Sequence, residues 1–325
     1  MKEVVIGIDI GGTFTKYGIV DREGNTYFEG STSTENFDNV NSYLKNLHLE
    51  LEKAIAEARK KEELNILGIG IGSPNGNYYK GTVEHAPNLK WKGIVHLADR
   101  FREYYNLPIK LTNDANAAAL GEMIYGGAKN MKDFIVVTLG TGLGSGIVVN
   151  GNVVYGHDGF AGELGHVTVK PNGRRCGCGR RGCLETYVSA TGIRRTLFKL
   201  MGATTFESEL RNYTFEQVDS RMIYEYAKKG DPLALEAFDN TARTLGLKLA
   251  DAVAITSPEA IFLFGGLTRA GEFIFDPTKK YMEENMLEIF KNKVKLLPSA
   301  LTDKNAAVLG ASALIWKELL LADQL

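Results

Sequence analysis

Two glycine-rich hairpins decide the fold of this chain. Residues 4–24, VVIGIDIGGTFTKYGIVDREG, form an apolar run, a tip at Gly11-Gly12-Thr13, and a second apolar run that ends in a polar turn. Residues 134–151, FIVVTLGTGLGSGIVVNG, repeat the pattern and end in Asn-Gly, a strong hairpin-turn dipeptide. Two similar hairpins far apart in one chain predict two related halves.

Predicted helices and strands alternate outside the hairpins. Apolar residues recur at helical spacing from Val40 to Ile55. A second helix is predicted to start at Asp231-Pro232, because Asp is a good cap and Pro suits the first turn. Further strands are predicted at residues 64–72, 109–112 and 260–264. The sequence therefore predicts an α/β protein.

The bulk composition is typical of a globular protein that acts on small molecules. The chain has 325 residues, 44% of them hydrophobic and 24% charged, and is long enough for two domains. Its formal net charge of -1 provides no field that attracts nucleic acid or an anionic membrane. It has no run of about 18 apolar residues and no leader pattern at its start. We therefore expect a cytoplasmic protein that binds neither nucleic acid nor membrane.

The two hairpin tips favour phosphate binding. Backbone N–H groups in a glycine-rich tip can approach phosphate oxygens, and Thr13 adds a hydroxyl donor. Asp9, at the end of the first strand, is placed to hold magnesium through water. The second tip, residues 140–146, lacks the lysine of a Walker loop and does not match a dinucleotide fingerprint. A glycine turn without a ligand remains the alternative for either tip alone.

Residues 112–119, TNDANAAA, place a polar pair between a short strand and an alanine-rich helix. In one interpretation Asp114 only caps the helix, which aspartate does well. In the other, Asp114 is a general base and Asn113 binds the substrate. Position alone favours the cap, so the choice depends on the rest of the chain.

The most specific pattern is a cluster of one histidine and three cysteines. His166 is followed by Cys176, Cys178 and Cys183, the three cysteines of the chain. Three thiolates and one imidazole complete a tetrahedral zinc shell with no open position, which is typical of a structural site. An odd, clustered set of cysteines suits a metal better than disulfides, and free thiols in a polar loop would oxidise. We therefore predict one structural zinc ion.

Together these patterns resemble the ROK family of sugar kinases, within the actin-like ATPase and sugar-kinase superfamily. The resemblance extends from Ile6 to about Gly310. Its most specific part is Glu163-Leu164-Gly165-His166 followed by Cys176-x-Cys178-Gly179-x-x-Gly182-Cys183-x-Glu185. Residues 9–13 resemble the family's first phosphate loop, residues 139–142 its second, and residues 264–267 its glycine turn beside adenosine.

The resemblance implies a role for each matching residue. Asp114 would be the catalytic base. The sugar would be bound by Gly72, Asn75, Asn88, Asn113, Asp114, Glu163, His166 and Glu185, with His166 also a zinc ligand. The nucleotide would be bound by Asp9, Gly11, Gly12, Thr13, Lys16, Gly140, Thr141, Gly142, Gly265 and Gly266. ATP, Mg²⁺ and structural Zn²⁺ would be the cofactors. Many relatives have a Pro-Gly turn where this chain has residues 75–77, a departure that bears on which sugar fits.

The resemblance also implies the architecture and the reaction. Two actin-like (ribonuclease H-like) α/β domains would flank a nucleotide and sugar cleft, residues 1–115 plus 303–325 in the smaller and 116–302 in the larger. The expected reaction is ATP-dependent phosphorylation of a hexose, first glucose, with N-acetylglucosamine, mannose, N-acetylmannosamine or fructose as alternatives. A sugar-responsive ROK regulator is the alternative of another class, although such repressors carry an added DNA-binding module and this chain starts with its first strand. Relatives are often dimers, so a homodimer is expected.

Overall fold

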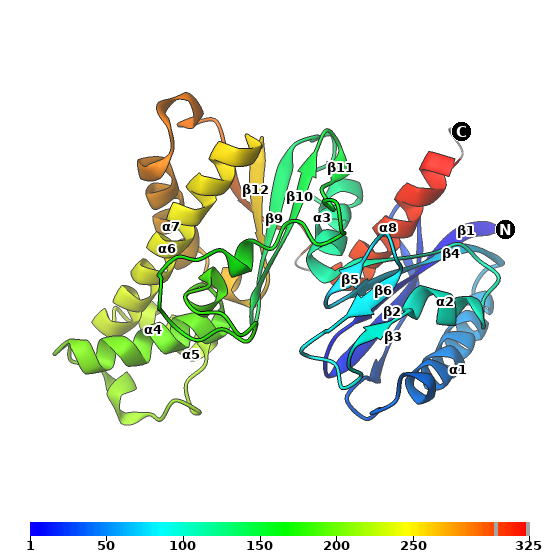
Figure 1. The fold of residues 1–325 in the computed structure, drawn as a ribbon, viewed down its shortest axis with the longest axis horizontal. Coiled ribbons are helices and arrows are strands. Elements are labelled where there is room, and N and C mark those ends of the chain that lie inside the picture. Colours follow the sequence, from blue (N-terminus) through cyan, green and yellow to red (C-terminus); the bar gives the residue numbers. More distant parts are fainter. Residues whose placement is uncertain (302–304, 323–325) are drawn as a thin grey trace. The chain divides into compact units, whose positions relative to one another are not determined.

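The computed structural model describes residues 1–301 and 305–322, which form two compact units (Figure 1). The first unit comprises Met1–Met131, Val153–Ala161 and the described residues from Ala300 onward. The second comprises Lys132–Asn152 and Gly162–Ser299. Each unit contains a five-stranded sheet with helices, so the α/β prediction is confirmed.

The two five-stranded sheets have the same strand pattern. The first has the order β3-β2-β1-β4-β8, with β1 antiparallel to β2 and parallel to β4. The second has the order β11-β10-β9-β12-β13, with β9 antiparallel to β10 and parallel to β12. The bounds are β1 Lys2–Ile10, β2 Phe14–Asp21, β3 Thr26–Ser33, β4 Leu64–Ser73, β8 Ile109–Asn113, β9 Phe134–Leu139, β10 Leu143–Val149, β11 Asn152–Val153, β12 Ala260–Phe264 and β13 Lys295–Pro298. The predicted relation between the two halves therefore appears as one strand order built twice.

The remaining elements are divided between the units. The first contains a small antiparallel sheet of β5 Gly76–Asn77, β6 Thr82–Glu84 and β7 Ile94–Val95. Its helices are α1 Val40–Arg59, α2 Leu97–Arg102, α3 Asp114–Ile124 and α8 Ala306–Ala322. The second contains α4 Ala190–Ala203, α5 Ser220–Lys228, α6 Pro232–Thr256 and α7 Glu272–Asn285. Short 3-10 turns are η1 Leu164–His166, η2 Leu184–Thr186, η3 Glu209–Asn212, η4 Gly266–Ala270 and η5 Glu288–Phe290.

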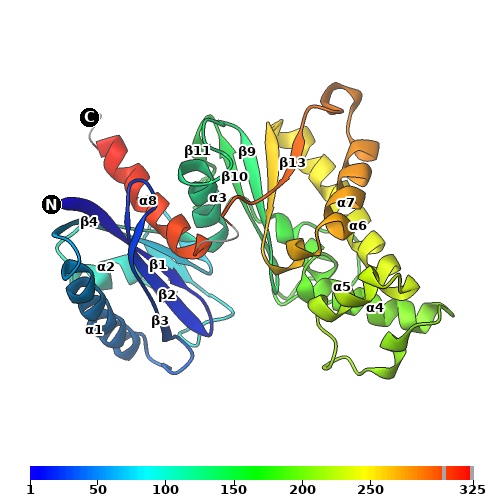
Figure 2. The ribbon, with the colours of Figure 1, turned by 180° about the vertical axis from the view of Figure 1, so that it is seen from behind.

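Helices α1 and α8 cover opposite faces of the first sheet because side chains alternate along each strand. Ile6 and Ile8 of β1 point into a buried cluster with Leu47 of α1. Gly7, between them, faces α8, where a side chain would collide with Val308 and Ser312. The absence of a side chain lets α8 lie directly on β1 and β4 (Figure 2).

Several sequence predictions agree closely with the structure. Asp231 caps α6, its carboxylate accepting from the N–H of Ala234 at 2.9 Å, and Pro232 is the first helical residue. The strand predicted at residues 260–264 has those bounds. The final helix was predicted from Asp303, which lies outside the described residues, and the described helix begins at Ala306. No helix among the described residues is long and apolar enough to cross a membrane.

Gly70→Ala should destabilise the first unit, because the added methyl group of β4 would collide with the backbone carbonyl of Ala311 in α8. We expect a loss of about 1–3 kcal/mol in the free energy of unfolding, measured by urea denaturation. Gly202→Ala is the matched control, since a side chain there meets nothing within 4 Å in a helix. The control should be neutral or slightly stabilising. Equal effects of the two changes would contradict this account of the α8 contact.

Candidate functional site

Parallel strands bring three predicted site residues to one edge of the first sheet. Asp9 of β1 pairs with Gly72 of β4, and Ser73 of β4 pairs with Asn113 of β8. A side chain at position 72 would lie 3.7 Å from the Asp9 carboxylate and 3.9 Å from the Asp114 backbone. Gly72 therefore lies between the two carboxylate-bearing residues, within van der Waals distance of both.

Asn113, and not Asp114, caps helix α3. Its side-chain oxygen accepts from the N–H of Asn116 at 2.7 Å. The Asp114 carboxylate accepts from the adjacent N–H of Ala115 at 2.8 Å, and the residue is exposed. The interpretation in which Asp114 only caps the helix is therefore wrong. Asn113 caps the helix, and the Asp114 carboxylate faces solvent. A general base must be accessible in this way, because it has to contact the substrate.

The electrostatics of this edge disfavour two negative charges. Burial, followed by repulsion from Asp114, raises the pKa of Asp9 to about 7, while Lys16 opposes the rise. Lys16 is the register partner of Asp9 on β2. Burial also raises the pKa of Asp114 above its ordinary value. Both carboxyl groups therefore keep their proton to a higher pH than an ordinary aspartate does.

The first glycine tip lies against another predicted site residue. Gly11 donates to the carbonyl of Phe14 at 3.0 Å, which closes the turn between β1 and β2. A side chain on Gly12 would lie 2.7 Å from the carbonyl of Asn88. Gly12 therefore brings the tip close to Asn88, and the side chains of Asn88 and Thr13 are exposed.

Asn75 has a structural role that the sequence analysis missed. It adopts a left-handed backbone conformation, with φ of 51°. Its side-chain N–H group donates to the carbonyl of Glu84 at 2.9 Å, which ties the residue to β6. The amide hydrogen is thus used within the protein, and the predicted contact of Asn75 with the sugar stays a prediction.

Parallel strands also bring two glycine turns together in the second unit. Phe264 of β12 pairs with Thr138 of β9, so the two strands end at the same edge. Gly265 has φ of 110°, and a side chain there would lie 2.6 Å from the carbonyl of Leu139. A side chain added to Gly140 or Gly266 would meet nothing within 4 Å, so both turns face open space. This edge can accept a ligand close to the backbone.

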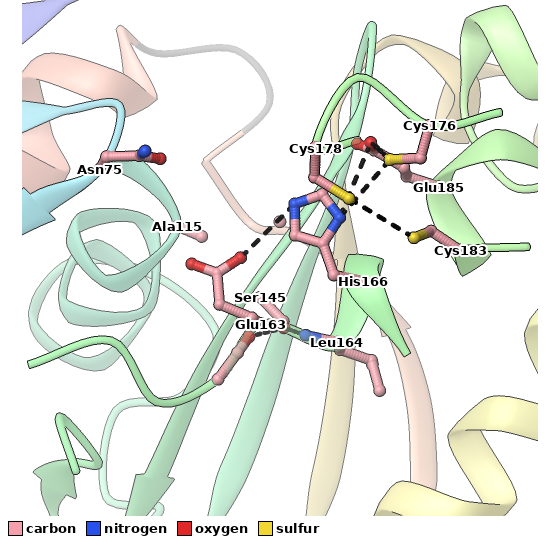
Figure 3. Close-up of polar contacts among 12 residues, drawn as sticks. Asn75, Ala115, Ser145, Glu163, Leu164, His166, Cys176, Cys178, Cys183 and Glu185 are labelled. Atoms are coloured by element: carbon pink, nitrogen blue, oxygen red, sulfur yellow. Dashed lines mark hydrogen bonds and ion pairs between the residues drawn. The ribbon is translucent and has the colours of Figure 1, made fainter. Parts of the chain in front are cut away.

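Ser145 of β10 positions the loop that carries Glu163. Its hydroxyl donates to the carbonyl of Gly162 and accepts from the N–H of Leu164 at 3.2 Å. The two contacts hold the backbone on both sides of Glu163 (Figure 3). The sequence analysis assigned residue 145 to a phosphate-binding tip. Nothing in the sequence of that tip indicates a contact with the loop of Glu163.

The four predicted metal ligands lie together. One ligand atom from each of His166, Cys176, Cys178 and Cys183 lies within 4.8 Å of the others (Figure 3). The sulfur atoms of Cys178 and Cys183 are 3.7 Å apart, and Nδ1 of His166 is 3.7 Å from the sulfur of Cys176. Ligands at zinc bond lengths in a tetrahedron are about 3.5–3.8 Å apart, so this set fits a zinc ion.

The predicted sugar-binding carboxylates of the second unit surround this cluster. Nε2 of His166, the nitrogen not facing Cys176, lies 3.9 Å from the Glu163 carboxylate. Glu185 lies on the other side, 2.8 Å from the sulfur of Cys176. A side chain on Gly142 would lie 2.7 Å from Glu185. The second glycine tip, Glu185 and the metal cluster are therefore neighbours.

Arg174 fastens the cysteine loop and was also missed from the sequence. Its guanidinium donates to the carbonyls of Thr186 at 2.7 Å and Gly192 at 3.1 Å, and lies over the Tyr187 ring. Burial lowers the pKa of Arg174 to about 10. These contacts hold the loop against η2, which contains Glu185, independently of any metal.

Comparisons with known proteins agree on one family. A family model described as ROK family matches residues 5–318. The glucokinase of Thermotoga maritima is 33% identical over 318 residues, 97% of this chain and 98% of that protein. A ROK family glucokinase structure from Streptomyces griseus, in complex with glucose and AMPPNP, has a TM-score of 0.78 and 32% identity, covering 96% of this chain and 98% of its own. A putative xylose repressor of Caldicellulosiruptor is 30% identical over 98% of this chain and 79% of that protein. The predicted fold class, two actin-like α/β domains, is confirmed.

Asp9→Asn should stabilise the ligand-free chain at high pH. The pKa of Asp9 is raised on folding, so its ionisation opposes folding, and that cost grows as pH rises from about 4 to about 7. We expect the variant to exceed wild type in unfolding free energy above pH 7, and the two to converge toward pH 4. Urea denaturation across this range measures the difference. Asp276→Asn, on the exposed surface of α7, is the control and should leave the unfolding free energy nearly unchanged. A constant difference at every pH would contradict the raised pKa.

Proposed function

The chain belongs to the ROK family, and we propose that it transfers the γ-phosphoryl group of ATP to a hydroxyl group of glucose. The observation that carries this proposal is the arrangement at the start of α3. Asn113 caps the helix, and the Asp114 carboxylate stays exposed at the edge where β1, β4 and β8 end. Full-length similarity to the Thermotoga maritima glucokinase supports glucose as the sugar.

Asp114 is the general base of the proposed reaction. Its carboxylate accepts the proton of the attacking sugar hydroxyl, a contribution typically worth about 10²–10⁴ in rate. Its raised pKa brings it nearer to neutrality and makes it a better proton acceptor than an ordinary aspartate. Asn113 uses its side-chain oxygen for the cap, so its N–H groups remain the donors offered to the sugar.

The two glycine tips and the glycine turn before η4 are the proposed phosphate and nucleotide contacts. Gly11, Gly12 and Thr13 serve in one unit, and Gly140, Thr141, Gly142, Gly265 and Gly266 in the other. Asp9 would hold Mg²⁺ through water, and the ion would supply positive charge beside the phosphates. Lys16, opposite Asp9, adds a positive charge near the same edge. Alignment and charge neutralisation supply most of the remaining rate enhancement.

Zinc has a structural role in this proposal. The ion would be held by His166, Cys176, Cys178 and Cys183, a complete set with no position left for substrate. Nδ1 of His166 faces Cys176, so metal binding there leaves Nε2–H to donate to a sugar hydroxyl. Glu163, near that nitrogen, and Glu185, beside the cluster, accept from other hydroxyls of the sugar.

A sugar-responsive regulator is the second candidate, because a putative xylose repressor matches 98% of this chain. Retention of a base and of two phosphate-binding edges favours the kinase, since a regulator needs none of them for catalysis. The net charge of -1 likewise offers no field for nucleic acid. ADP release measured without sugar and then with glucose distinguishes a kinase from a regulator. The proposed assembly is a homodimer.

Asp114→Asn should lower kcat by about 10²–10⁴ with glucose, ATP and Mg²⁺, because the proton acceptor is lost while the shape is kept. Sugar-dependent ADP release measures the effect, with mannose, fructose, N-acetylglucosamine and N-acetylmannosamine in the same panel. Asp251→Asn, on the exposed face of α6, is the control and should keep wild-type rates. Unchanged turnover in Asp114→Asn would refute the base assignment.

The protein should contain about one tightly bound zinc ion per chain. Zinc content by elemental analysis should fall sharply in His166→Ala and stay unchanged in His96→Ala, an exposed histidine outside the cluster. Removal of zinc with a chelator should lower the thermal midpoint, since the metal closes the loop. A metal-free protein of equal stability would rule out the structural role.

A further inference from the structure

A short segment leaves the second unit and packs within the first. Residues 153–161 belong to the first unit, and the chain returns to the second at Gly162, directly before Glu163. Within this segment the Tyr155 ring stacks on Tyr78, with ring centroids 4.0 Å apart and ring planes 4° from parallel. Tyr79 meets the Tyr155 ring edge-on at 6.0 Å. Aromatic stacking of this kind stabilises beyond the area it buries.

Backbone contacts hold the same segment. The side-chain N–H group of Asn77, which is fully buried, donates to the carbonyl of Asp158 at 2.7 Å. A side chain on Gly159 would lie 2.7 Å from the Asn77 side chain, so only glycine permits this approach. Ala161 donates to the carbonyl of Tyr155 at 3.0 Å and closes the segment on itself. The end of the segment is therefore fixed two residues before Glu163.

The segment that carries Tyr78 lies against the strand that leads to the proposed base. A side chain on Gly76, two residues before Tyr78, would lie 2.4 Å from the carbonyl of Thr112 in β8. Only glycine permits this approach to Thr112, which is fully buried. Thr112 immediately precedes Asn113 and Asp114 in β8.

Tyr78 is itself held in place by other residues of the first unit. Its hydroxyl donates to the carboxylate of Glu318 in α8 at 2.6 Å. Lys110 of β8 pairs with the same carboxylate at 2.8 Å and lies 4.8 Å from the centre of the Tyr78 ring. The surface on which Tyr155 stacks is thus fixed by two further elements of the first unit.

We propose that Tyr155 is a positioning residue for the sugar site. Its own segment leads from Ala161 to Glu163, and the ring on which it stacks, Tyr78, follows Asn75 closely. Through Gly76, the Tyr78 segment also lies against Thr112, directly before Asn113-Asp114. The inference rests on the proposed function and adds to it a residue that does not touch the sugar. The inference predicts that replacing Tyr155 lowers the affinity for glucose, through these three groups, more than the affinity for ATP.

The test uses three variants of the full chain. Tyr155→Leu keeps apolar bulk but loses the stack and the hydroxyl, and should raise KM for glucose by about tenfold or more. Its kcat should change by less than about threefold and its KM for ATP by less than about twofold. Tyr155→Phe keeps the stack and should restore KM for glucose to within about threefold of wild type. Tyr213→Leu, which removes a ring contact with Tyr226 in the second unit, should match wild type.

The outcomes separate this inference from the proposed function. Wild type without turnover on any hexose of the panel would overturn both. Wild-type turnover with an unchanged KM for glucose in Tyr155→Leu would overturn only the positioning role. A third outcome is a loss of kcat in both Tyr155→Leu and Tyr155→Phe, with the KM for glucose and the KM for ATP changed equally. That result would indicate a merely structural residue and would also overturn the positioning role. Where Tyr155→Leu fails to fold, the same KM split is required of Tyr78→Leu, which removes the other ring of the stack.

Discussion

Parallel pairing of strands is the constraint on which the rest of each unit depends. Because β1, β4 and β8 run the same way, Asp9, Gly72 and Asn113 arrive at one edge, and the loops that follow must meet there. The same pairing of β9 with β12 brings residues 140 and 265 together in the second unit. Glycine then determines how near the backbones come: Gly70 lets α8 lie on β4, and Gly265 lets its turn reach Leu139.

The sequence predicted what local patterns determine. Alternating hydrophobicity and the Asn-Gly turn locate the hairpins, Asp231-Pro232 locates the start of α6, and clustered cysteines locate the metal ligands. The wrong helix cap at residue 114 shows the limit. Asn and Asp are equally good caps, and the choice between adjacent residues is made by the backbone angle at the end of β8. The structural contacts of Asn75, Ser145, Arg174 and Tyr155 were missed because no sequence pattern around these residues indicates their partners.

The cysteine loop is fastened in two independent ways. The proposed zinc ion would tie Cys176, Cys178 and Cys183 to His166. Arg174 ties the same loop to η2 and α4 through neutral acceptors. A partly buried cation is costly unless its N–H groups have acceptors, and Arg174 donates to three acceptors here. Glu185 lies between the two attachments, so its position is determined from both sides.

In the proposed function, the raised pKa values at the first sheet edge would couple ligand binding to proton release. Burial raises the pKa of Asp9 to about 7 and also raises the pKa of Asp114, so the edge would lose a proton when a metal nucleotide binds. A cation near Asp9 favours its ionised form and lowers its pKa, as Lys16 already does in part. In the proposed function, a magnesium ion near Asp9 would offset the negative charge that faces Asp114, so Asp114 would ionise more readily as the base. Affinity for the metal nucleotide would then rise with pH through the range in which Asp9 ionises.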